Sequence, residues 1–332
     1  MPPHIPAPRA SGATSSTVVP LHWAVYGPAG APQLLVLHGG PGAQHDYLLP
    51  QMLRLAERHE LIFYDQRGGG RSRTDDRTPI TWRTQVDDLA AVIREMQLGQ
   101  PSIVGYSWGG LLAMLYALVA AGALDAGAEG APRPPAPARL VLIDPAPPTR
   151  AMRHVFEEEF DRRQRAPRVQ AMRAELAASG LRERDPDAYR QRQFELSVAG
   201  YFADPERAHD LTPFRVTSRV QQSVWNSLGD YDLLSSLHAI TCPTLIAHGR
   251  EDPIPLSASE AIAARLPRAE LVPIAGSGHV PYVEAPEPLF AAIDRFLAAT
   301  DPPARETTGT SEHASEHRSE HADEHASERS SR

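Results

Sequence analysis

The strongest chemical signal in the sequence is a serine between glycines, in Gly105-Tyr106-Ser107-Trp108-Gly109. The apolar run SIV precedes this pentapeptide and the apolar run LLAMLYAL follows it. When a strand, a sharp turn and a helix follow one another, a serine in the turn has its hydroxyl exposed. The residues on either side of it must be small, because larger side chains would collide with neighbouring backbone. The Trp108 amide and the positive end of the helix then face a developing oxyanion. The pattern predicts a nucleophile at Ser107; the alternative is a serine in an ordinary tight turn.

A serine is a nucleophile at neutral pH only when a base removes its proton and an acid orients that base. His279 lies in a loop just after the last expected strand and is the favoured base, whereas His248 ends a strand and is expected to be structural. Two acids stand at strand ends, Asp252 and Asp144. Both fit the order serine, acid, histidine. We expect Asp252, which follows the strand at 244–248 and precedes His279 by 27 residues, to be the acid, and Asp144 to be a helix cap or hinge residue.

A glycine-rich turn, HGGPG over residues 38–42, follows another apolar strand. Glycine lets backbone approach a ligand closely, so an amide here can join that of Trp108 in an oxyanion hole. We expect Gly40 to be that donor; a plain Gly/Pro turn is the alternative. A second glycine-rich segment begins at Tyr64, and there Asp65 and Arg67 are interpreted as braces for the loops around the site.

The elements that must position these residues alternate between short apolar runs and longer amphipathic ones, which is typical of a mostly parallel sheet covered by helices. Seven strands are expected, at 18–26, 33–38, 61–64, 102–105, 140–144, 244–248 and 270–273. Helices are expected at 85–97, 108–121, 258–266 and 288–300. The stretch from about 148 to 237 has helical spacing and weak strand signals, so it is interpreted as an inserted helical cap.

This assignment divides the 332 residues into a core over 18–147 and 238–300, a cap over 148–237, and two ends. Residues 1–17 consist mainly of Pro, Ala, Ser and Thr, and residues 301–332 mainly of Ser, Glu, His, Ala and Arg. Such segments bury too little apolar surface to fold, so both ends are expected to be disordered. The tail has eight acids and four arginines, hence −4 of the formal net charge of −8.

Composition excludes several classes of function. All 33 basic residues are arginine, which rules out a Schiff-base lysine, a Walker-type phosphate lysine and a Ser-Lys dyad. The acidic balance predicts no binding to nucleic acid. The single cysteine, Cys242, excludes a disulfide framework and a cysteine-based zinc cluster. No window approaches 18 uninterrupted apolar residues, and the first residues lack the basic region and apolar stretch typical of a signal peptide. We expect a cytoplasmic protein with no membrane association and no cofactor.

Taken together, the motifs HGGPG, DQRGGGRS, GYSWGG, a later Gly-x-x-Asp and a final Gly-x-Gly-His resemble those of the α/β-hydrolase superfamily, specifically its proline iminopeptidase-like branch. The resemblance extends over about Val18 to Thr300. It implies an α/β-hydrolase fold, a Ser107-Asp252-His279 triad, and oxyanion donors at Gly40 and Trp108.

The substrate-binding positions depart from the family pattern. Proline iminopeptidases hold the substrate's amino terminus with cap glutamates, and in some members a glutamate directly follows the catalytic aspartate, where this chain has Pro253. The cap still offers glutamates, of which Glu195 is the expected substrate contact, and Trp225 is expected to line the pocket. Aromatic residues in the cap are equally compatible with an ester or a lactone.

The resulting hypothesis is a serine hydrolase without cofactor or metal that acts on short peptides as an aminopeptidase. A carboxylic ester or lactone hydrolase is the first alternative, and a non-catalytic binding protein on the same scaffold is the second. The tail repeats histidine every four residues, at His313, His317, His321 and His325. On a helix that spacing would suit Zn²⁺ or Ni²⁺, but a solvated polar repeat is favoured.

Overall fold

The computed structural model describes residues 5–49, 51–75, 77–125 and 133–300, and the expected disordered tail therefore lies outside the described residues. Eight strands of the described chain form one sheet in the order β1-β2-β4-β3-β5-β6-β7-β8. Strands β1 and β2 run antiparallel to their neighbours, and all other pairs are parallel. The strands are β1 (Ala10–Ala13), β2 (His22–Tyr26), β3 (Gln33–Leu37), β4 (Glu60–Tyr64), β5 (Ser102–Tyr106), β6 (Arg139–Ile143), β7 (Thr244–Gly249) and β8 (Ala269–Ile274).

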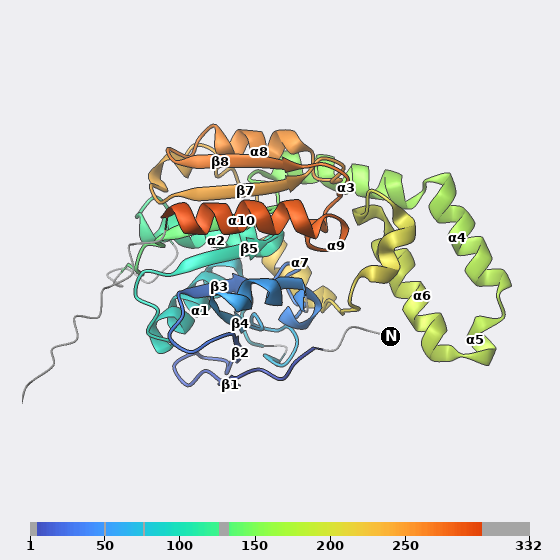
Figure 1. Ribbon diagram of the computed structural model, residues 1–332, viewed down its shortest axis with the longest axis horizontal. Coiled ribbons are helices and arrows are strands. Elements are labelled where there is room, and N and C mark those ends of the chain that lie inside the picture. Colours follow the sequence, from blue (N-terminus) through green and yellow to red (C-terminus); the bar gives the residue numbers. More distant parts are fainter. Residues whose placement is uncertain (1–4, 50, 76, 126–132, 301–332) are drawn as a thin grey trace, which may run out of the picture. The chain divides into compact units, whose positions relative to one another are not determined.

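Helices connect and cover these strands (Figure 1). In the sheet-covering part they are α1 (Trp82–Glu95), α2 (Trp108–Ala120), α8 (Leu256–Ala263), α9 (Pro281–Glu284) and α10 (Pro286–Thr300). Between β6 and β7 the chain forms α3 (Arg150–Gln164), α4 (Pro167–Ala178), α5 (Leu181–Arg184), α6 (Pro186–Val198) and α7 (Ser218–Leu228). A mostly parallel sheet with helices on both faces and a helical insertion before β7 is the α/β-hydrolase fold that the motifs predict.

Side chains point alternately to the two faces of the sheet along each strand, and this produces two hydrophobic cores, one on each face. In β3, Leu35 and Leu37 belong to the core under α1 and α2, whereas Leu34 and Val36 belong to the core under α10. Because side chains alternate across a strand, a strand buried on both faces must be apolar at nearly every position. Helix α2 is buried on all sides from Trp108 to Leu118, which explains its uniformly apolar sequence.

The expectation that residues 1–17 are disordered is wrong for Ala10–Ala13. These residues form β1, which pairs antiparallel with β2 along its full length. Strand pairing needs only backbone groups, so a segment poor in apolar side chains can still extend a sheet at its edge. The following serines fix the segment further, because Ser15 and Ser16 both donate backbone hydrogen bonds to the Glu95 carboxylate, at 2.8 and 2.9 Å.

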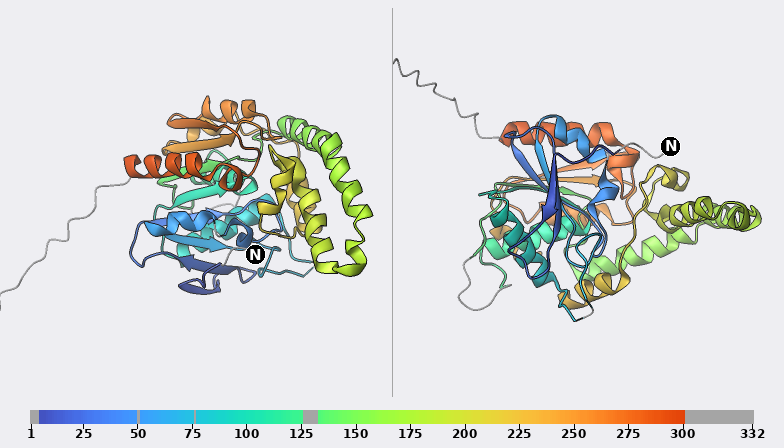
Figure 2. Two further views of the ribbon diagram at one scale, coloured as in Figure 1. Left: turned by 45° about the vertical axis from the view of Figure 1, so that its right-hand side comes forward. Right: turned by 90° about the horizontal axis from the view of Figure 1, so that it is seen from below.

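The inserted helices leave and rejoin the sheet at a single place. An antiparallel bridge joins Thr149 to Asp232, flanked by hydrogen bonds from Arg150 N to Tyr231 O and from Leu233 N to Pro148 O. Helices α4 and α6 lie side by side and extend away from the sheet, with α5 at their tip (Figures 1 and 2). Helix α7 instead packs against α1. The insertion therefore has a fixed base and a projecting arm.

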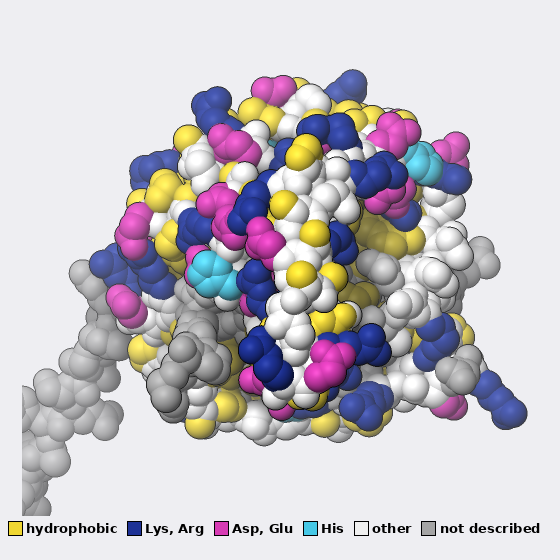
Figure 3. All heavy atoms as spheres, turned by 90° about the vertical axis from the view of Figure 1, so that its right-hand side faces the viewer, with side chains coloured by type: hydrophobic (Ala, Val, Ile, Leu, Met, Phe, Trp, Pro, Cys, Tyr) yellow, Lys and Arg dark blue, Asp and Glu magenta, His cyan; other side chains and the backbone are white. Residues whose placement is uncertain are grey.

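On the face that carries this arm, arginines and acids are interspersed and do not gather by sign (Figure 3). A surface of this kind lacks the contiguous positive patch that attracts nucleic acid. Within the described ranges, no helix combines the length and the apolar content that crossing a membrane requires.

A buried ion pair ties the loop after β4 to α1. The Arg67 guanidinium donates two hydrogen bonds to the Asp88 carboxylate, at 2.7 and 2.6 Å, and the two side chains are 5% and 3% exposed. Burial raises the pKa of Asp88, and the Arg67 hydrogen bonds oppose that rise. A pair buried to this degree is costly to break because the remaining group keeps its desolvation penalty.

We predict that Arg67→Met lowers the free energy of unfolding by about 3–5 kcal/mol, because Asp88 is left buried without its partner. Urea denaturation at neutral pH measures the loss, and Arg67→Met combined with Asp88→Leu should recover most of it. The control is Arg162→Met, since Arg162 is 71% exposed in its pair with Glu159 and such pairs contribute less than about 1 kcal/mol. Equal losses in the two single variants would contradict the prediction.

Candidate active site

Ser107 occupies a strained turn between β5 and α2. Its backbone has φ 53° and ψ −118°, a conformation that side-chain-bearing residues rarely adopt. The turn is held by hydrogen bonds from Ser107 N to Ile143 O and from Ala146 N to Ser107 O, both 2.9 Å. The flanking glycines are required by space: a Cβ on Gly109 would lie 2.2 Å from Leu37 O, and one on Gly105 would lie 2.5 Å from Gly109 O.

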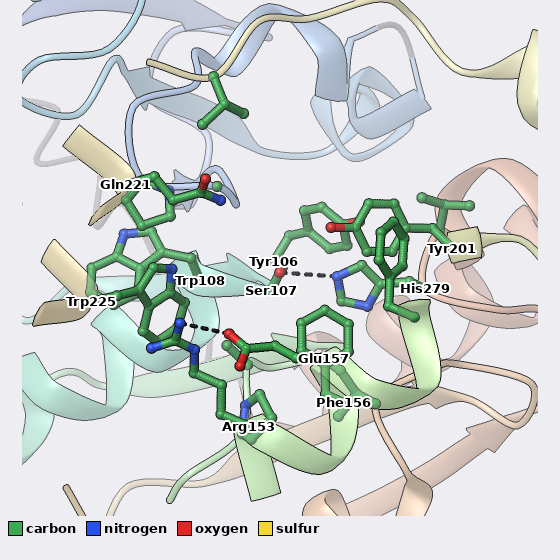
Figure 4. Close-up of a pocket in the computed structure, with 18 of the residues that line it drawn as sticks. Tyr106, Ser107, Trp108, Arg153, Phe156, Glu157, Tyr201, Gln221, Trp225 and His279 are labelled. Carbon is green, nitrogen blue, oxygen red and sulfur yellow. Dashed lines mark hydrogen bonds and ion pairs between the residues drawn. The ribbon is translucent and has the colours of Figure 1, made fainter. Parts of the chain in front are cut away.

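Three side chains from different loops form one continuous series of hydrogen bonds, and Figure 4 shows its part between His279 and Ser107. The Nδ1 of His279 lies 2.8 Å from Asp252 Oδ2, and its Nε2 lies 3.0 Å from Ser107 Oγ. A carboxylate only accepts, so Nδ1 carries the proton and Nε2 is free to accept from the serine hydroxyl. This arrangement has the geometry of a nucleophile, a base and an orienting acid.

The loops that carry Asp252 and His279 are fixed by contacts with backbone groups. Asp252 follows β7, and its Oδ1 accepts a hydrogen bond from Ile254 N at 2.7 Å. His279 follows β8, and its amide donates to Tyr201 O of the cap at 2.7 Å. Burial alone would raise the pKa of the Asp252 carboxyl, but the interactions with His279, joined by those with His248 and Asp144, keep that pKa below its ordinary value.

The two acids considered from the sequence lie next to each other, but only one contacts the histidine. Asp252 bonds to His279, whereas Asp144, at the end of β6, accepts a hydrogen bond from Gly249 N at 2.8 Å. His248 is also buried; its Nε2 donates to Ile254 O and its Nδ1 accepts from Ser259 Oγ, both 2.9 Å. The geometry thus favours Asp252 over Asp144 as the partner of His279.

The glycine-rich turn after β3 lies beside Ser107. A Cβ on Gly39 would lie 2.9 Å from Ser107 Cβ, and Gly40, with φ 64°, lines the same cavity as Ser107. Within the described part of the chain, the Gly40 amide donates no backbone hydrogen bond. Trp108 provides the first amide of α2, which has no partner inside its own helix. Both amides are thus available to a ligand atom near Ser107.

Gln66, a residue without a predicted role, joins the Trp108 side chain to the start of the turn after β3. Its side-chain oxygen accepts from Trp108 Nε1 at 2.8 Å, and its side-chain nitrogen donates to His38 O at 2.8 Å. Its backbone amide donates to His38 Nε2, and His38 Nδ1 donates to Gly39 O. Complete burial lowers the pKa of His38 to about 4, so this ring is neutral at pH 7 and accepts that bond.

The neighbouring Asp65 anchors the same loop, as expected for a brace. It accepts hydrogen bonds from His45 N at 3.0 Å, from His45 Nδ1 at 2.7 Å and from Arg71 N at 2.9 Å. Burial alone would raise the pKa of Asp65, but the bonds from His45 and Arg71 hold it well below its ordinary range. The loop that carries Gln66 is therefore fixed on both sides, by Asp65 and by the Arg67 pair.

A cavity of about 410 Å³ opens above Ser107 and His279 and is covered by the cap. Near His279 its wall is aromatic, with Phe156 and Tyr201, while Gln221 and Trp225 lie on the other side of Ser107 (Figure 4). Its charged and amide-bearing lining residues are Arg153, Glu157, Asp161, Gln221, Gln222 and Asn226, together with His279.

Within this cavity an ion pair lies against the expected pocket residue Trp225. Arg153 Nη2 donates to Glu157 Oε1 at 2.6 Å, and the Arg153 guanidinium stacks 4.2 Å above the Trp225 ring. Trp225 in turn contacts the ring of Trp108 edge-on at 5.3 Å. Trp225 therefore lines the cavity, and Glu157 is the glutamate that the cap brings to it.

Glu195, the glutamate expected to contact substrate, does not line the cavity. Its carboxylate is buried on α6, where it accepts hydrogen bonds from Arg192 at 2.5 Å and Gln191 at 3.0 Å. Residues three and four positions apart lie on the same helix face, which explains both contacts. Contrary to the prediction, Glu195 therefore pairs within its own helix and does not face the cavity above Ser107.

Comparison with known proteins agrees with this architecture. Residues 34–292 match the model of the alpha/beta hydrolase family, so the chain belongs to that family. It is 28% identical to the proline iminopeptidase of Heyndrickxia coagulans, over 81% of this chain and 91% of that protein. It is 29% identical to a protein named as a carbamate hydrolase, RutD, of Caulobacter sp. (strain K31), over 86% of this chain and 98% of that protein.

Solved structures show the same fold. The proline iminopeptidase of Mycobacterium smegmatis superposes with a TM-score of 0.63 at 22% identity, covering 88% of this chain and 98% of that one. A thermophilic esterase from Thermogutta terrifontis superposes with a TM-score of 0.57 at 24% identity, covering 88% of this chain and 100% of that one. These likenesses establish a hydrolase fold that different hydrolases share.

We predict that Gln66→Leu lowers kcat by roughly tenfold to hundredfold with little change in KM, because the turn after β3 and the Trp108 side chain are no longer held together. Removing an oxyanion-hole donor itself lowers kcat more than this. Steady-state kinetics on an activated aryl ester measures the effect. Gln33→Leu is the matched control, because the Gln33 amide bonds to Glu60 at the opposite end of β3. A KM effect alone would show that Gln66 does not support the donors.

Proposed function

We propose that this protein is a serine hydrolase that works through an acyl-enzyme. The observation that carries the proposal is the continuous hydrogen-bonded chain from Asp252 through His279 to Ser107, which ends at the cavity. Ser107 is the nucleophile, His279 the base and Asp252 the orienting acid. The amides of Gly40 and Trp108 form the oxyanion hole.

The reaction proceeds in two balanced halves. Ser107 Oγ attacks the substrate carbonyl carbon while its proton passes to His279 Nε2, and the resulting oxyanion accepts hydrogen bonds from the two amides. His279 then gives that proton to the leaving amine or alcohol as the C–N or C–O bond breaks. In the second half, water loses a proton to His279 and attacks the ester, and Ser107 takes the proton back as the acid leaves.

We predict that Ser107→Ala lowers turnover by roughly four to six orders of magnitude. Labelling by a fluorophosphonate probe should disappear in the same variant. Ser197→Ala, on the exposed surface of α6, is the control for an unrelated serine hydroxyl. A wild-type protein that is folded but takes up no label would instead support a non-catalytic binding role on the same scaffold.

The substrate class that we propose is a short peptide with a free amino terminus and a small first residue such as proline. The names of several relatives support this class, and so does the Glu157 carboxylate inside the cavity. A buried ammonium needs a charged partner, since burying an unpaired ammonium costs several kcal/mol of free energy. Glu157 can act as this partner because its Oε1 pairs with Arg153 while Oε2 has only a distant contact, 3.4 Å to His154 Nδ1.

A carboxylic ester or lactone hydrolase is the second candidate. The observation that favours it is the Arg153–Glu157 pair itself, because the acid that would meet an ammonium is already partly neutralised. Pro253 after Asp252 also leaves one family position for a substrate-binding glutamate unfilled. An uncharged ester would fit the aromatic part of the cavity without competing for either charge.

A panel of three substrates separates the two candidates: a prolyl arylamide, its N-acylated form and an uncharged aryl ester. For an aminopeptidase, we predict that acylation abolishes cleavage and that Glu157→Gln lowers kcat/KM for the free amine by roughly tenfold to hundredfold, as loss of a charged hydrogen bond implies. Cleavage of the ester should change little. Glu158→Gln is the control, since Glu158 is exposed on the same helix.

The esterase candidate predicts the opposite results with the same substrates. Equal cleavage of the free and acylated arylamides, with no effect of Glu157→Gln on either, would reject the aminopeptidase and retain the esterase. Both outcomes leave the Ser107 assignment to the labelling experiment.

A further inference from the structure

Two carboxyl groups are buried together behind the histidine. Asp144 directly follows β6 and Asp252 follows β7, and these strands are neighbours in the sheet. Both side chains are 0% exposed. One oxygen of each carboxyl and one ring nitrogen of His279 all lie within 4.8 Å of one another. Two negative charges at this separation away from water would repel each other strongly.

The hydrogen-bond donors around the two groups are unequally shared. Asp252 receives Ile254 N on Oδ1 and His279 Nδ1 on Oδ2. Asp144 receives Gly249 N on Oδ1, whereas its Oδ2 is buried and has no donor among the described residues. A buried carboxylate oxygen without a donor is costly. A proton on that oxygen would remove the cost, because the group would then become a donor.

Among the described residues that surround Asp144, none supplies a positive charge that bonds to it. His248 Nδ1 lies 3.6 Å from Asp144 Oδ1, but this ring already bonds to Ser259 and Ile254. Burial also lowers the pKa of His248, which keeps it neutral.

The other titratable groups that interact electrostatically with Asp144 are Glu284, Tyr106 and Tyr282. They are acidic or neutral, and burial raises the pKa of each of them. Burial also raises the pKa of Asp144 well above its ordinary value, and the charge on Asp252 adds to that rise. The surroundings therefore favour the neutral form of one acid and the ionised form of the other.

We infer that Asp144 is a neutral carboxylic acid whose Oδ2 proton is donated in a hydrogen bond to the Asp252 carboxylate. Asp144 is thus a positioning residue: it adds a donor to Asp252 and fixes the carboxylate that orients His279. This inference rests on the proposed role of Asp252. The backbone agrees with it, because Asp144 has φ 41°, a strained conformation that surrounding contacts must maintain.

The informative substitution is Asp144→Asn, because an amide reproduces the protonated acid: its oxygen can accept from Gly249 and its NH₂ can donate to Asp252. We expect the apparent pKa of the acidic limb of the kcat/KM profile to stay where it is in the wild type. If Asp144 were ionised, the same substitution would remove a negative charge beside the histidine, and the limb would move to lower pH. A downward shift of one pH unit or more would overturn the inference.

Asp144→Ala provides the complementary result. Loss of the donor to Asp252 should lower kcat/KM by roughly tenfold to hundredfold and move the acidic limb to higher pH, and Asp144→Asn should restore both. The control is Asp187→Asn, an exposed aspartate on α6. If Asp144→Ala does not fold, the Asn variant still decides between the two protonation states.

A measurement that does not depend on activity separates this inference from the proposed function. Infrared difference spectra of wild type against Asp144→Asn should contain the carbonyl stretch of a protonated carboxyl group at neutral pH. A carboxylate signal in its place would reject the inference even for an active enzyme. Failure of the wild type to react with a fluorophosphonate would reject the proposed function and leave the infrared result standing.

Discussion

The close approach of backbone around Ser107 is the constraint on which the rest of the site depends. The end of β3, the end of β5 and the start of α2 meet so tightly that side chains at Gly105 or Gly109 would overlap main-chain atoms. The same tightness brings the turn after β3 to the serine. A strained residue persists only when its surroundings over-determine it, and here the fully buried α2 provides that support.

This constraint divides the work between the two parts of the fold. The carboxyl ends of parallel strands meet at one edge, and they deliver Ser107, Asp252 and His279 from loops after β5, β7 and β8. The cap contributes walls instead: aromatic rings beside the histidine and the Arg153–Glu157 pair against Trp225. Changes at these cap side chains can therefore alter which substrate fits, whereas the segment at Tyr201 is bonded to the His279 loop itself.

The sequence was most informative where local pattern and position coincide. Apolar runs predicted seven of the strands, and the glycines around Ser107 predicted the turn between β5 and α2. Strand β1 escaped prediction because it is held by backbone pairing, which leaves little trace in composition. Gln66 escaped because its role depends on Trp108 and His38, which are distant in sequence. The prediction for Glu195 was wrong because the presence of a carboxylate does not reveal that Arg192 and Gln191 already donate hydrogen bonds to it.

The hydrogen bond from the His279 amide to Tyr201 O has a consequence for access to the cavity. Tyr201 belongs to the cap, and Glu284 strengthens the same junction by accepting bonds from Gly278 N at 2.7 Å and Ala203 N at 3.0 Å. A cap movement that lifts this segment from the sheet must release the loop that carries the base. The position of His279 relative to Ser107 therefore depends on where the cap lies, so access to the cavity and the geometry of the site are linked.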